Sequence, residues 1–295
     1  METKRLNVLV TGGNGQLGRA LREASAGSEN RYIFSDISAP EGEEMLFLDA
    51  TDAAAVKLVC DSEKIDVIIN CAGYTDVDGA EDDPATAALL NAEVPKHLAA
   101  SAKRRKAVLV HISTDYIFSG KDSAPIAEDA VAAPINVYGA SKLAGEKAIT
   151  GSGCNYIILR TAWLYSKYGK NFVGTMRRLT AERKNLKVVY DQVGTPTFAG
   201  DLATFIINII DGGMLSKTGI YNYSNLGVAS WYDFSLAIRD LFGNNCDISP
   251  CLSEEYPQKA HRPHYSVLDK ALVQKEFGIT IPYWRDSLEK CIKNF

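Results

Sequence analysis

Strand-like and helix-like segments alternate through the first half of the chain, and this alternation constrains the fold more than any other feature. Short runs rich in β-branched residues are separated by longer segments with helical spacing of apolar residues. We expect strands at the runs RLNVLV, RYIFSD, EMLFLD, DVIINCAG, AVLVHIS and NYIILRT. Strands that alternate with helices run parallel and are joined by right-handed crossovers. The pattern therefore predicts an α/β fold with a doubly wound parallel sheet of the Rossmann type.

The alternation loosens after about residue 165. There NFVGTMRRLTAERK and DLATFIINIIDG indicate helices, whereas KVVYD and GIYNYSN indicate strands. We expect a dinucleotide-binding domain over 1–164, to which the chain returns at about 198–225. A smaller, α-rich substrate lobe is expected to comprise about 165–197 and 226–295.

Composition excludes several classes of partner. The 295 residues carry a formal net charge of −4, which gives no electrostatic reason to expect nucleic acid or an anionic membrane surface. The six cysteines form no CxxC pair, which favours free thiols in a reducing compartment. METKRLNVLV passes directly into a strand-like run, leaving no room for a signal peptide, and LATFIINII is too short to span a bilayer. We expect a cytoplasmic protein.

A glycine-rich turn follows the first predicted strand, in NVLVTGGNGQLGRAL. Gly12 allows a tight turn, Gly15 lets backbone amides approach a pyrophosphate, and Gly18 lets the following helix pack on the sheet. A bare glycine triplet is weak evidence, but its place between a strand and a helix favours dinucleotide binding over a plain structural turn. The intervening loop residues Asn14, Gln16 and Leu17 are then expected to contact the cofactor as well.

Asp36 ends the second predicted strand, where an acidic residue accepts hydrogen bonds from the adenosine ribose. A turn aspartate is the alternative interpretation. A carboxylate here disfavours a 2′-phosphate and makes NADH the first expectation. Arg19 and Arg31 lie close enough in the sequence to keep NADPH open.

Two neighbouring polar segments predict a chemical site, HISTDYIFSG and NVYGASK. On a helix, Tyr138 and Lys142 project to the same side, and a neighbouring cation favours the phenolate form of a tyrosine. Ser113 and Thr114 end the preceding strand, where a hydroxyl can hold a carbonyl oxygen. Tyr-x-x-x-Lys alone would be no better than chance. Combined with the glycine turn and these hydroxyls, it predicts a catalytic triad of Thr114, Tyr138 and Lys142.

These motifs together resemble the dTDP-4-dehydrorhamnose reductases, a family of the extended short-chain dehydrogenase/reductase superfamily. The G-x-x-G-x-x-G spacing is that of the superfamily. The likeness runs in order through TGGNGQLG, CAGYTDVDGAE, HISTDYIFSG, PINVYGASKLAGEKA, LRTAWLY, NFVGTM, DQVGTPT and RPHYSVLD, and so covers nearly the whole chain.

The resemblance implies NAD(P)H-dependent reduction of the C4 ketone of dTDP-4-dehydro-L-rhamnose, the last step of dTDP-L-rhamnose synthesis. By that resemblance Thr114 bonds the substrate oxygen, Tyr138 donates the proton, and Lys142 binds the nicotinamide ribose and tunes Tyr138. It also implies that Asp49, at the adenine edge, and Ala72 and Gly73, beside the fourth strand, contact the cofactor. The residues expected to face the nucleotide-sugar are Tyr116, Trp163, Asn171, Gln192, Thr197 and Arg262.

The sequence leaves two alternative functions open. Another sugar-nucleotide epimerase or dehydratase of the superfamily is one alternative. A non-catalytic NADP-binding regulatory subunit of methionine adenosyltransferase is the other. Relatives that bind magnesium do so through surface acids at a dimer contact, and because no such acids are identifiable here, no metal is assigned. A homodimer is left as an expectation.

Overall fold

The computed structural model describes residues 5–39, 42 and 44–295. Residues 1–4, at the start of the segment METKRLNVLV, lie outside the described residues. The central layer is a seven-stranded sheet in the order β3-β2-β1-β4-β5-β6-β11, in which every neighbouring pair is parallel. Its strands are β1 (Asn7–Thr11), β2 (Arg31–Asp36), β3 (Leu46–Phe47), β4 (Val67–Asn70), β5 (Val108–Thr114), β6 (Asn155–Thr161) and β11 (Gly219–Asn222). The predicted doubly wound Rossmann sheet is confirmed, and the segment GIYNYSN provides its seventh strand.

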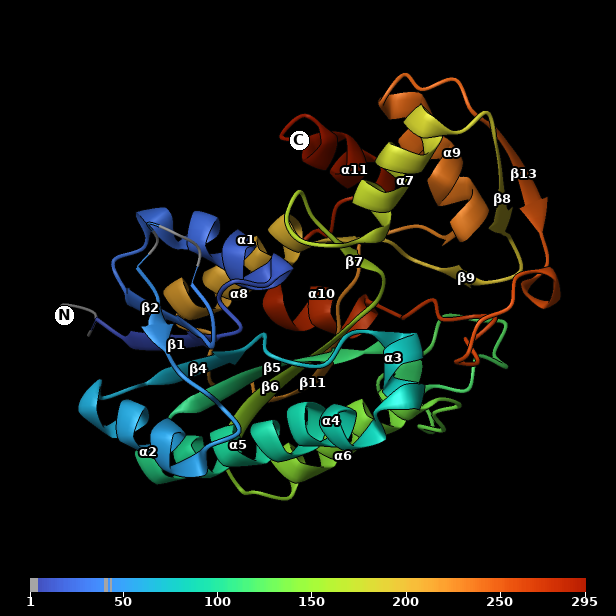
Figure 1. Ribbon diagram of the computed structural model, residues 1–295. Coiled ribbons are helices and arrows are strands. Elements are labelled where there is room, and N and C mark those ends of the chain that lie inside the picture. The colour runs from blue at the N-terminus through green and yellow to red at the C-terminus, as the bar shows by residue number, and fades with distance from the viewer. Residues whose placement is uncertain (1–4, 40–41, 43) are drawn as a thin grey trace.

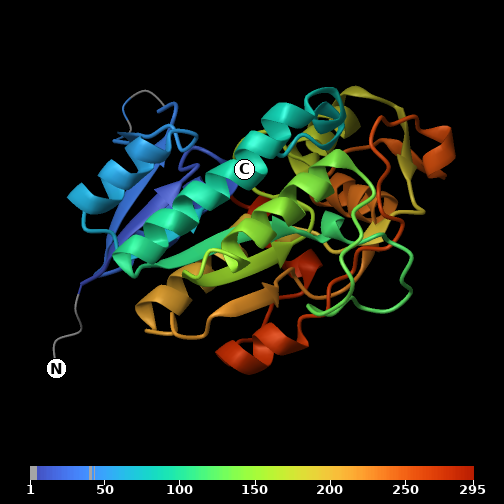
Figure 2. The same cartoon turned by 90° about the horizontal axis from the view of Figure 1, so that it is seen from below.

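Helices cover both faces of this sheet (Figures 1 and 2). One face carries α2 (Ala53–Ser62), α5 (Val94–Arg105) and α6 (Val137–Thr150), and the other carries α1 (Gln16–Ala24), α8 (Ala199–Asp211) and α10 (Ala271–Phe277). Successive residues of one strand point to opposite faces, so in β1 Leu9 packs with α2 and α5 while Val8 and Val10 pack with α1 and α8. A strand buried on both faces must be apolar throughout, which is why these strands read as continuous apolar runs.

The segment ATAALLNAEVPKHLAASAKR forms a helical run with one irregular turn. α4 (Pro84–Ala88) passes through a π-helical turn at Leu89–Glu93 into α5, and α3 (Val77–Asp82) precedes it. Asn91 lies in the π-helical turn, where its side chain bonds both backbone groups of Tyr74 and the hydroxyl of Ser141. The irregular turn therefore ties the loop after β4 to α6, beside the candidate site.

A second core lies beyond the carboxyl ends of the strands, at the upper right of Figure 1. Its helices are α7 (Phe172–Glu182), α9 (Trp231–Leu241) and α11 (Trp284–Ile292). Its strands form three two-stranded pairs: β7 (Leu164–Tyr165) with β10 (Thr197–Phe198), β8 (Asn185–Val189) with β13 (Asp247–Cys251), and β9 (Val193–Gly194) with β12 (Ala229–Ser230). Aromatic side chains such as Tyr165, Phe234 and Trp284 fill its interior.

All six cysteines are free, as predicted. Within the described part of the chain, no helix has the length and apolar character needed to cross a bilayer.

Candidate active site

The glycine turn brings the start of α1 against the end of β4. Gly12 has a φ of +67°, and a Cβ added to it would lie 2.6 Å from the backbone nitrogen of Ala72. A Cβ on Gly18 would lie 2.3 Å from the carbonyl oxygen of Gly12. Gly15 caps α1 without any side-chain hydrogen bond, so the first amides of this helix are left for an anionic ligand. This cradle fits a dinucleotide pyrophosphate.

Asp36 lies at the end of β2 beside this turn. Its carboxylate accepts hydrogen bonds from the backbone amides of Asn14 (3.1 Å), Ile37 (2.8 Å) and Ser38 (3.3 Å). Both oxygens are thereby held at the mouth of the glycine turn. Asp49 lies farther along the sheet edge and accepts from the amide and hydroxyl of Thr51, which lower the pKa of its carboxyl.

Thr114, Tyr116 and Tyr138 meet where β5 ends. Asn136 caps α6 by accepting a hydrogen bond from the amide of Gly139 at 2.7 Å. A Cβ on Gly139 would lie 2.1 Å from the carbonyl oxygen of Tyr116, so only glycine lets α6 approach the turn after β5 this closely. The rings of Tyr116 and Tyr138 then pack edge to face with centroids 5.8 Å apart.

Lys142 lies one helical turn after Tyr138 and is buried. Its Nζ donates to the carbonyl oxygen of Ile112 at 2.6 Å, which fixes the ammonium at the end of β5. Burial lowers the pKa of Lys142 to about 8.

The pKa of Tyr138 is not lowered, contrary to the expectation that the neighbouring cation would favour the phenolate. Burial raises the pKa of Tyr138 to about 12, and the hydrogen bond with Thr114 lowers it by less. Desolvation of the phenolate therefore outweighs any stabilisation by Lys142. Tyr138 is a protonated phenol at neutral pH, suited to donating a proton rather than to accepting one.

The hydroxyl of Ser113 was expected to be a second donor to a carbonyl oxygen, but it is bonded to another residue. Its hydroxyl donates to Oε1 of Glu146 at 2.5 Å. Glu146 also accepts two hydrogen bonds from the guanidinium of Arg160, at 3.0 Å and 2.8 Å, and both side chains are almost fully buried. Ser113 thus joins a buried ion pair behind the site, and Thr114 is left as the hydroxyl beside Tyr138.

Trp163 faces the site from the turn after β6. It has a φ of +48°, and its indole stacks on that of Trp231, with centroids 3.5 Å apart and an interplanar angle of 8°. Phe172 packs obliquely on the other ring of this pair, Trp231. The alternation pattern gave no signal for Trp231, because its partner lies almost seventy positions earlier in the sequence.

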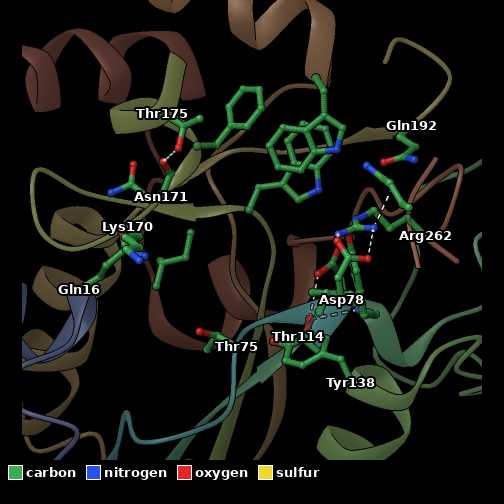
Figure 3. Close-up of a pocket in the computed structure, with 18 of the residues that line it drawn as sticks. Gln16, Thr75, Asp78, Thr114, Tyr138, Lys170, Asn171, Thr175, Gln192 and Arg262 are labelled. Carbon is green, nitrogen blue, oxygen red and sulfur yellow. Dashed lines mark hydrogen bonds and ion pairs between the residues drawn. The ribbon is translucent and has the colours of Figure 1, made fainter. Parts of the chain in front are cut away.

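Arg262 comes from the C-terminal part of the chain and is paired with Asp78 at the start of α3. Its two terminal nitrogens donate to the two carboxylate oxygens, at 3.1 Å and 2.8 Å. Figure 3 shows this pair next to Thr114 and Tyr138. Arg262 also lies near Tyr116: burial opposes its charge, but Asp78 and the Tyr116 phenol together raise the pKa of Arg262. In the sequence, Asp78 could be recognised only as part of an unassigned polar loop.

Two of the remaining predicted sugar-binding residues line the cavity, Asn171 and Gln192, whereas Thr197 does not. Asn171 caps α7 and donates to the carbonyl of Ser166, and Gln192 donates to the hydroxyl of Ser253 at 2.9 Å. Figure 3 shows Asn171 and Gln192 at opposite ends of the site. Thr197 lies in β10 with its side chain fully buried, away from the cavity.

One cavity of about 1270 Å³ joins most of these side chains. The predicted site residues that line it are Gly15, Gln16, Leu17, Ala72, Gly73, Thr114, Tyr116, Tyr138, Lys142, Trp163, Asn171, Gln192 and Arg262. Those that do not line it are Gly12, Asn14, Gly18, Asp36, Asp49 and Thr197. Within the described residues, no three His, Cys, Asp or Glu side chains are grouped so as to hold a metal ion.

Comparison with known proteins gives a consistent result. The model of the RmlD substrate binding domain family matches residues 6–295. The dTDP-4-dehydrorhamnose reductase of Aggregatibacter actinomycetemcomitans is 38% identical over 96% of this chain and 97% of its own length. A probable dTDP-4,6-dihydroxy-2-methyloxan-3-one 4-ketoreductase of Streptomyces antibioticus is 40% identical over 88% of this chain and 85% of its own length.

A solved structure supports the same assignment. The dTDP-4-dehydrorhamnose reductase of Bacillus anthracis, in complex with NADP, is 36% identical, covers 99% of this chain and 100% of its own, and gives a TM-score of 0.92. The resemblance predicted from the sequence motifs is confirmed. The chain belongs to the dTDP-4-dehydrorhamnose reductase family.

Proposed function

We propose that this protein reduces the C4 ketone of dTDP-4-dehydro-L-rhamnose to give dTDP-L-rhamnose, using NADH or NADPH. The observation that carries this proposal is the meeting of Thr114, Tyr138 and Lys142 in the cavity that also reaches the glycine turn. Membership of a family of reductases supports it. The six free thiols fit a reducing compartment such as the cytoplasm.

Tyr138 acts as the general acid. A reduced nicotinamide held in this cavity would supply the hydride. The phenol of Tyr138 protonates the carbonyl oxygen, and its raised pKa keeps the proton available at neutral pH. Thr114, beside Tyr138, holds the same oxygen. Lys142 has two further N–H groups besides the one given to Ile112, and these are suited to the nicotinamide ribose.

The cofactor site combines the glycine turn, Ala72 and Gly73 with Asp36 at the end of β2. The carboxylate of Asp36 favours a free ribose hydroxyl, whereas the relative from Bacillus anthracis is in complex with NADP. We propose binding of either dinucleotide, with the preference set by Asp36 and Arg19.

The second core is proposed as the lobe that binds the nucleotide-sugar. Its contributions to the cavity include the Trp163–Trp231 stack and residues from β8, and the C-terminal segment adds Arg262. The reacting sugar would then lie between this lobe and the Thr114–Tyr138 pair. We propose the dinucleotide-binding domain and this lobe with the bounds predicted above, except that α10 packs on the sheet and therefore belongs with the dinucleotide-binding domain.

Tyr116 argues against a dehydratase. Removal of water across C5 and C6 of a sugar requires a base that accepts a carbon-bound proton. Burial raises the pKa of Tyr116 well above its usual range, so the phenol is not such a base. Intact Thr114, Tyr138 and Lys142 argue for catalysis rather than a purely regulatory role.

A substrate panel tests the proposal. The purified protein is incubated with dTDP-, UDP- and GDP-linked 4-keto-6-deoxy sugars, each with NADH and with NADPH. The panel includes the 4-keto sugar named for the Streptomyces antibioticus relative. We expect oxidation of the cofactor with dTDP-4-dehydro-L-rhamnose as the best substrate. Preference for another sugar would reassign the substrate, and inertness toward all of them would contradict the function.

A further inference from the structure

Asp115 is a buried carboxyl group at the cavity that the proposed reaction leaves without a role. It follows Thr114 directly, opens the short 3₁₀ turn Asp115–Ile117, and is 2% exposed. It lines the same cavity as Tyr116 and Tyr138. A carboxyl group in such a place requires a reason, because burying one is costly unless its oxygens are hydrogen-bonded.

The hydroxyl of Thr114 links Asp115 to the reacting groups. Its Oγ1 donates to Oδ1 of Asp115 at 3.1 Å and accepts from the amide of Tyr116 at 3.2 Å. Tyr138 lies close enough to this hydroxyl for it to affect the pKa of the phenol. A hydroxyl has one proton to donate and two lone pairs. Because the Tyr116 amide takes one lone pair, Asp115 and Tyr138 compete for the remaining hydrogen-bonding positions of Thr114.

The state of Asp115 decides this competition. An ionised carboxylate can only accept hydrogen bonds, so the Thr114 hydroxyl donates to it. The remaining lone pair of Thr114 then accepts a hydrogen bond from Tyr138, which turns the phenolic proton away from the cavity. A neutral carboxyl can instead donate to Thr114. The Thr114 proton is then free for the substrate oxygen, and so is the Tyr138 proton.

The surroundings of Asp115 disfavour its ionised form enough that the neutral carboxyl is populated up to neutral pH. Oδ2 is buried and accepts no hydrogen bond from any described residue. Burial raises the pKa of Asp115 to about 7, and the hydroxyls of Ser266 and Thr114 lower it by less. The ionisable groups that face it are Tyr116 on its own turn, Tyr138 on α6, and Arg262 beyond Tyr116. Lys142 is the next cation on α6, held at Ile112.

We propose that Asp115 is a positioning residue whose neutral carboxyl donates to Thr114 and so directs the protons of Thr114 and Tyr138 toward the ketone oxygen. When Asp115 is ionised, Thr114 donates to Asp115 and Tyr138 donates to Thr114. Neither proton then points toward the ketone oxygen. Asp115 acts through Thr114 and does not touch the substrate. The inference rests on the proposed ketone reduction.

The first test is the pH dependence of the reduction step, measured in single turnovers with saturating cofactor. In the wild type we expect the rate to fall about tenfold per pH unit above the pKa of Asp115. Asp115→Asn places a permanent N–H donor beside Thr114, and we expect this fall to disappear while KM for the sugar changes little. Glu128→Gln is the matched control. Burial also raises the pKa of Glu128, but it lies outside the cavity, so its variant should keep the wild-type profile.

A double-mutant comparison tests the route through Thr114. In a Thr114→Val background we expect Asp115→Asn to leave the pH profile unchanged, because no hydroxyl remains to be directed. An equal effect of Asp115→Asn with and without the Thr114 hydroxyl would overturn the inference.

The ionisation itself is measured in the wild type by ¹³C NMR of labelled aspartate carboxyls, with the Asp115 resonance assigned from Asp115→Asn. We expect it to titrate with the same midpoint as the rate. A carboxyl that stays ionised throughout, or a rate profile unaltered by Asp115→Asn, would overturn the proposal. A wild type that reduces none of the 4-keto sugars would overturn the proposed function, and this outcome is distinct from an active enzyme whose profile ignores Asp115.

Discussion

Two phenols face one cavity, the buried Tyr116 and the partly buried Tyr138, and their neighbours separate their roles. Tyr138 lies beside Thr114 and one turn before Lys142. Tyr116 lies near Arg262, which is itself paired with Asp78. Tyr138 is thus connected to groups suited to proton transfer, and Tyr116 to groups suited to holding a polar ligand.

Exchanging each phenol for phenylalanine should separate these roles. We expect Tyr138→Phe to lower turnover by about two to four orders of magnitude with cofactor affinity near that of the wild type, because the general acid is lost. Tyr116→Phe is its matched partner in the same cavity and should mainly raise KM for the nucleotide-sugar. Steady-state kinetics and cofactor titration measure both. Near-normal turnover of Tyr138→Phe would end its assignment as the acid.

At this scale the sequence predicted the residues better than their environments. Tyr138, Lys142 and Thr114 could be found from the spacing and the strand end, and the structure brings them together. The raised pKa of Tyr138 and the hydrogen bond from Ser113 to Glu146 could not be predicted from the sequence. Both depend on burial and on a partner from another element. Trp231 was missed for the same reason.

Among the elements, the C-terminal segment 256–264 connects the second core to the helices of the sheet beside the cavity: the amide of Val193 donates to the carbonyl of His264 at 2.7 Å. Besides the Arg262–Asp78 pair, the amide of Ala260 donates to Asp78 at 3.0 Å, and Lys259 pairs with Asp82 at 2.5 Å. Asn136 donates to the carbonyl of His261 at 2.8 Å. The segment is therefore held against α3 and the start of α6, next to Tyr138.

The two ion pairs of this segment should differ in importance. Asp78→Asn removes the bidentate partner of the largely buried Arg262, and we expect KM for the nucleotide-sugar to rise about tenfold, because Arg262 is no longer held toward Tyr116. Asp82→Asn is the control: both members of its pair are exposed, and such pairs contribute little. Equal effects of the two substitutions would show that the orientation of Arg262 is unimportant.

The turn after β2 should control the choice of cofactor. Replacing Asp36 with alanine removes a carboxylate that repels a 2′-phosphate, so we expect weaker NADH binding and a shift of preference toward NADPH. Fluorescence titration with both dinucleotides measures this. A wild type that already strongly prefers NADPH would show that Asp36 does not contact the ribose.

Elements of ordinary length were predictable, and the shortest were not. Each of the six expected strands of the first half is present, as are α7, α8, β8 and β11. The pairs β7–β10 and β9–β12 contain strands of two residues, too short for any period to be read. The π-helical turn at Leu89–Glu93 was also missed, because apolar spacing does not report a local change of hydrogen bonding.

Across the whole molecule, the site lies where the carboxyl ends of the parallel strands meet the second core. Ligands of open α/β sheets bind at this edge, and Thr114, Ala72 and Trp163 reach it from three different strands. Sequence pattern predicts the sheet, and thereby which strand ends converge. The distance between the second lobe and these strand ends is set by side-chain packing between segments that are distant in the sequence. A pattern of apolar residues does not report such packing.

Burying Asp115 should also affect the stability of the whole protein. Its pKa of about 7 in the folded state exceeds the ordinary value of 3.8, so the folded state binds more protons than the unfolded state between these values. The contribution of Asp115 to the free energy of unfolding should therefore fall as the pH rises from about 4 to about 7, and remain constant above that.

Asp115→Asn removes this contribution, so its stability relative to the wild type should improve as the pH rises through the same range, by about 1.4 kcal/mol for each unit of pKa shift. Urea unfolding of both proteins at a series of pH values measures the difference. A difference that does not change with pH would contradict the assigned pKa.

The central claim is that hydride reaches C4 of the sugar while this chain supplies the proton, and isotopic labelling tests it most directly. The enzyme is incubated with dTDP-4-dehydro-L-rhamnose and cofactor deuterated at the transferred position, and the product is analysed by mass spectrometry and NMR. We predict dTDP-L-rhamnose with deuterium at C4 and equimolar oxidation of the cofactor. A product without that deuterium, or a product lighter by one water from dTDP-glucose and oxidised cofactor, would contradict the account.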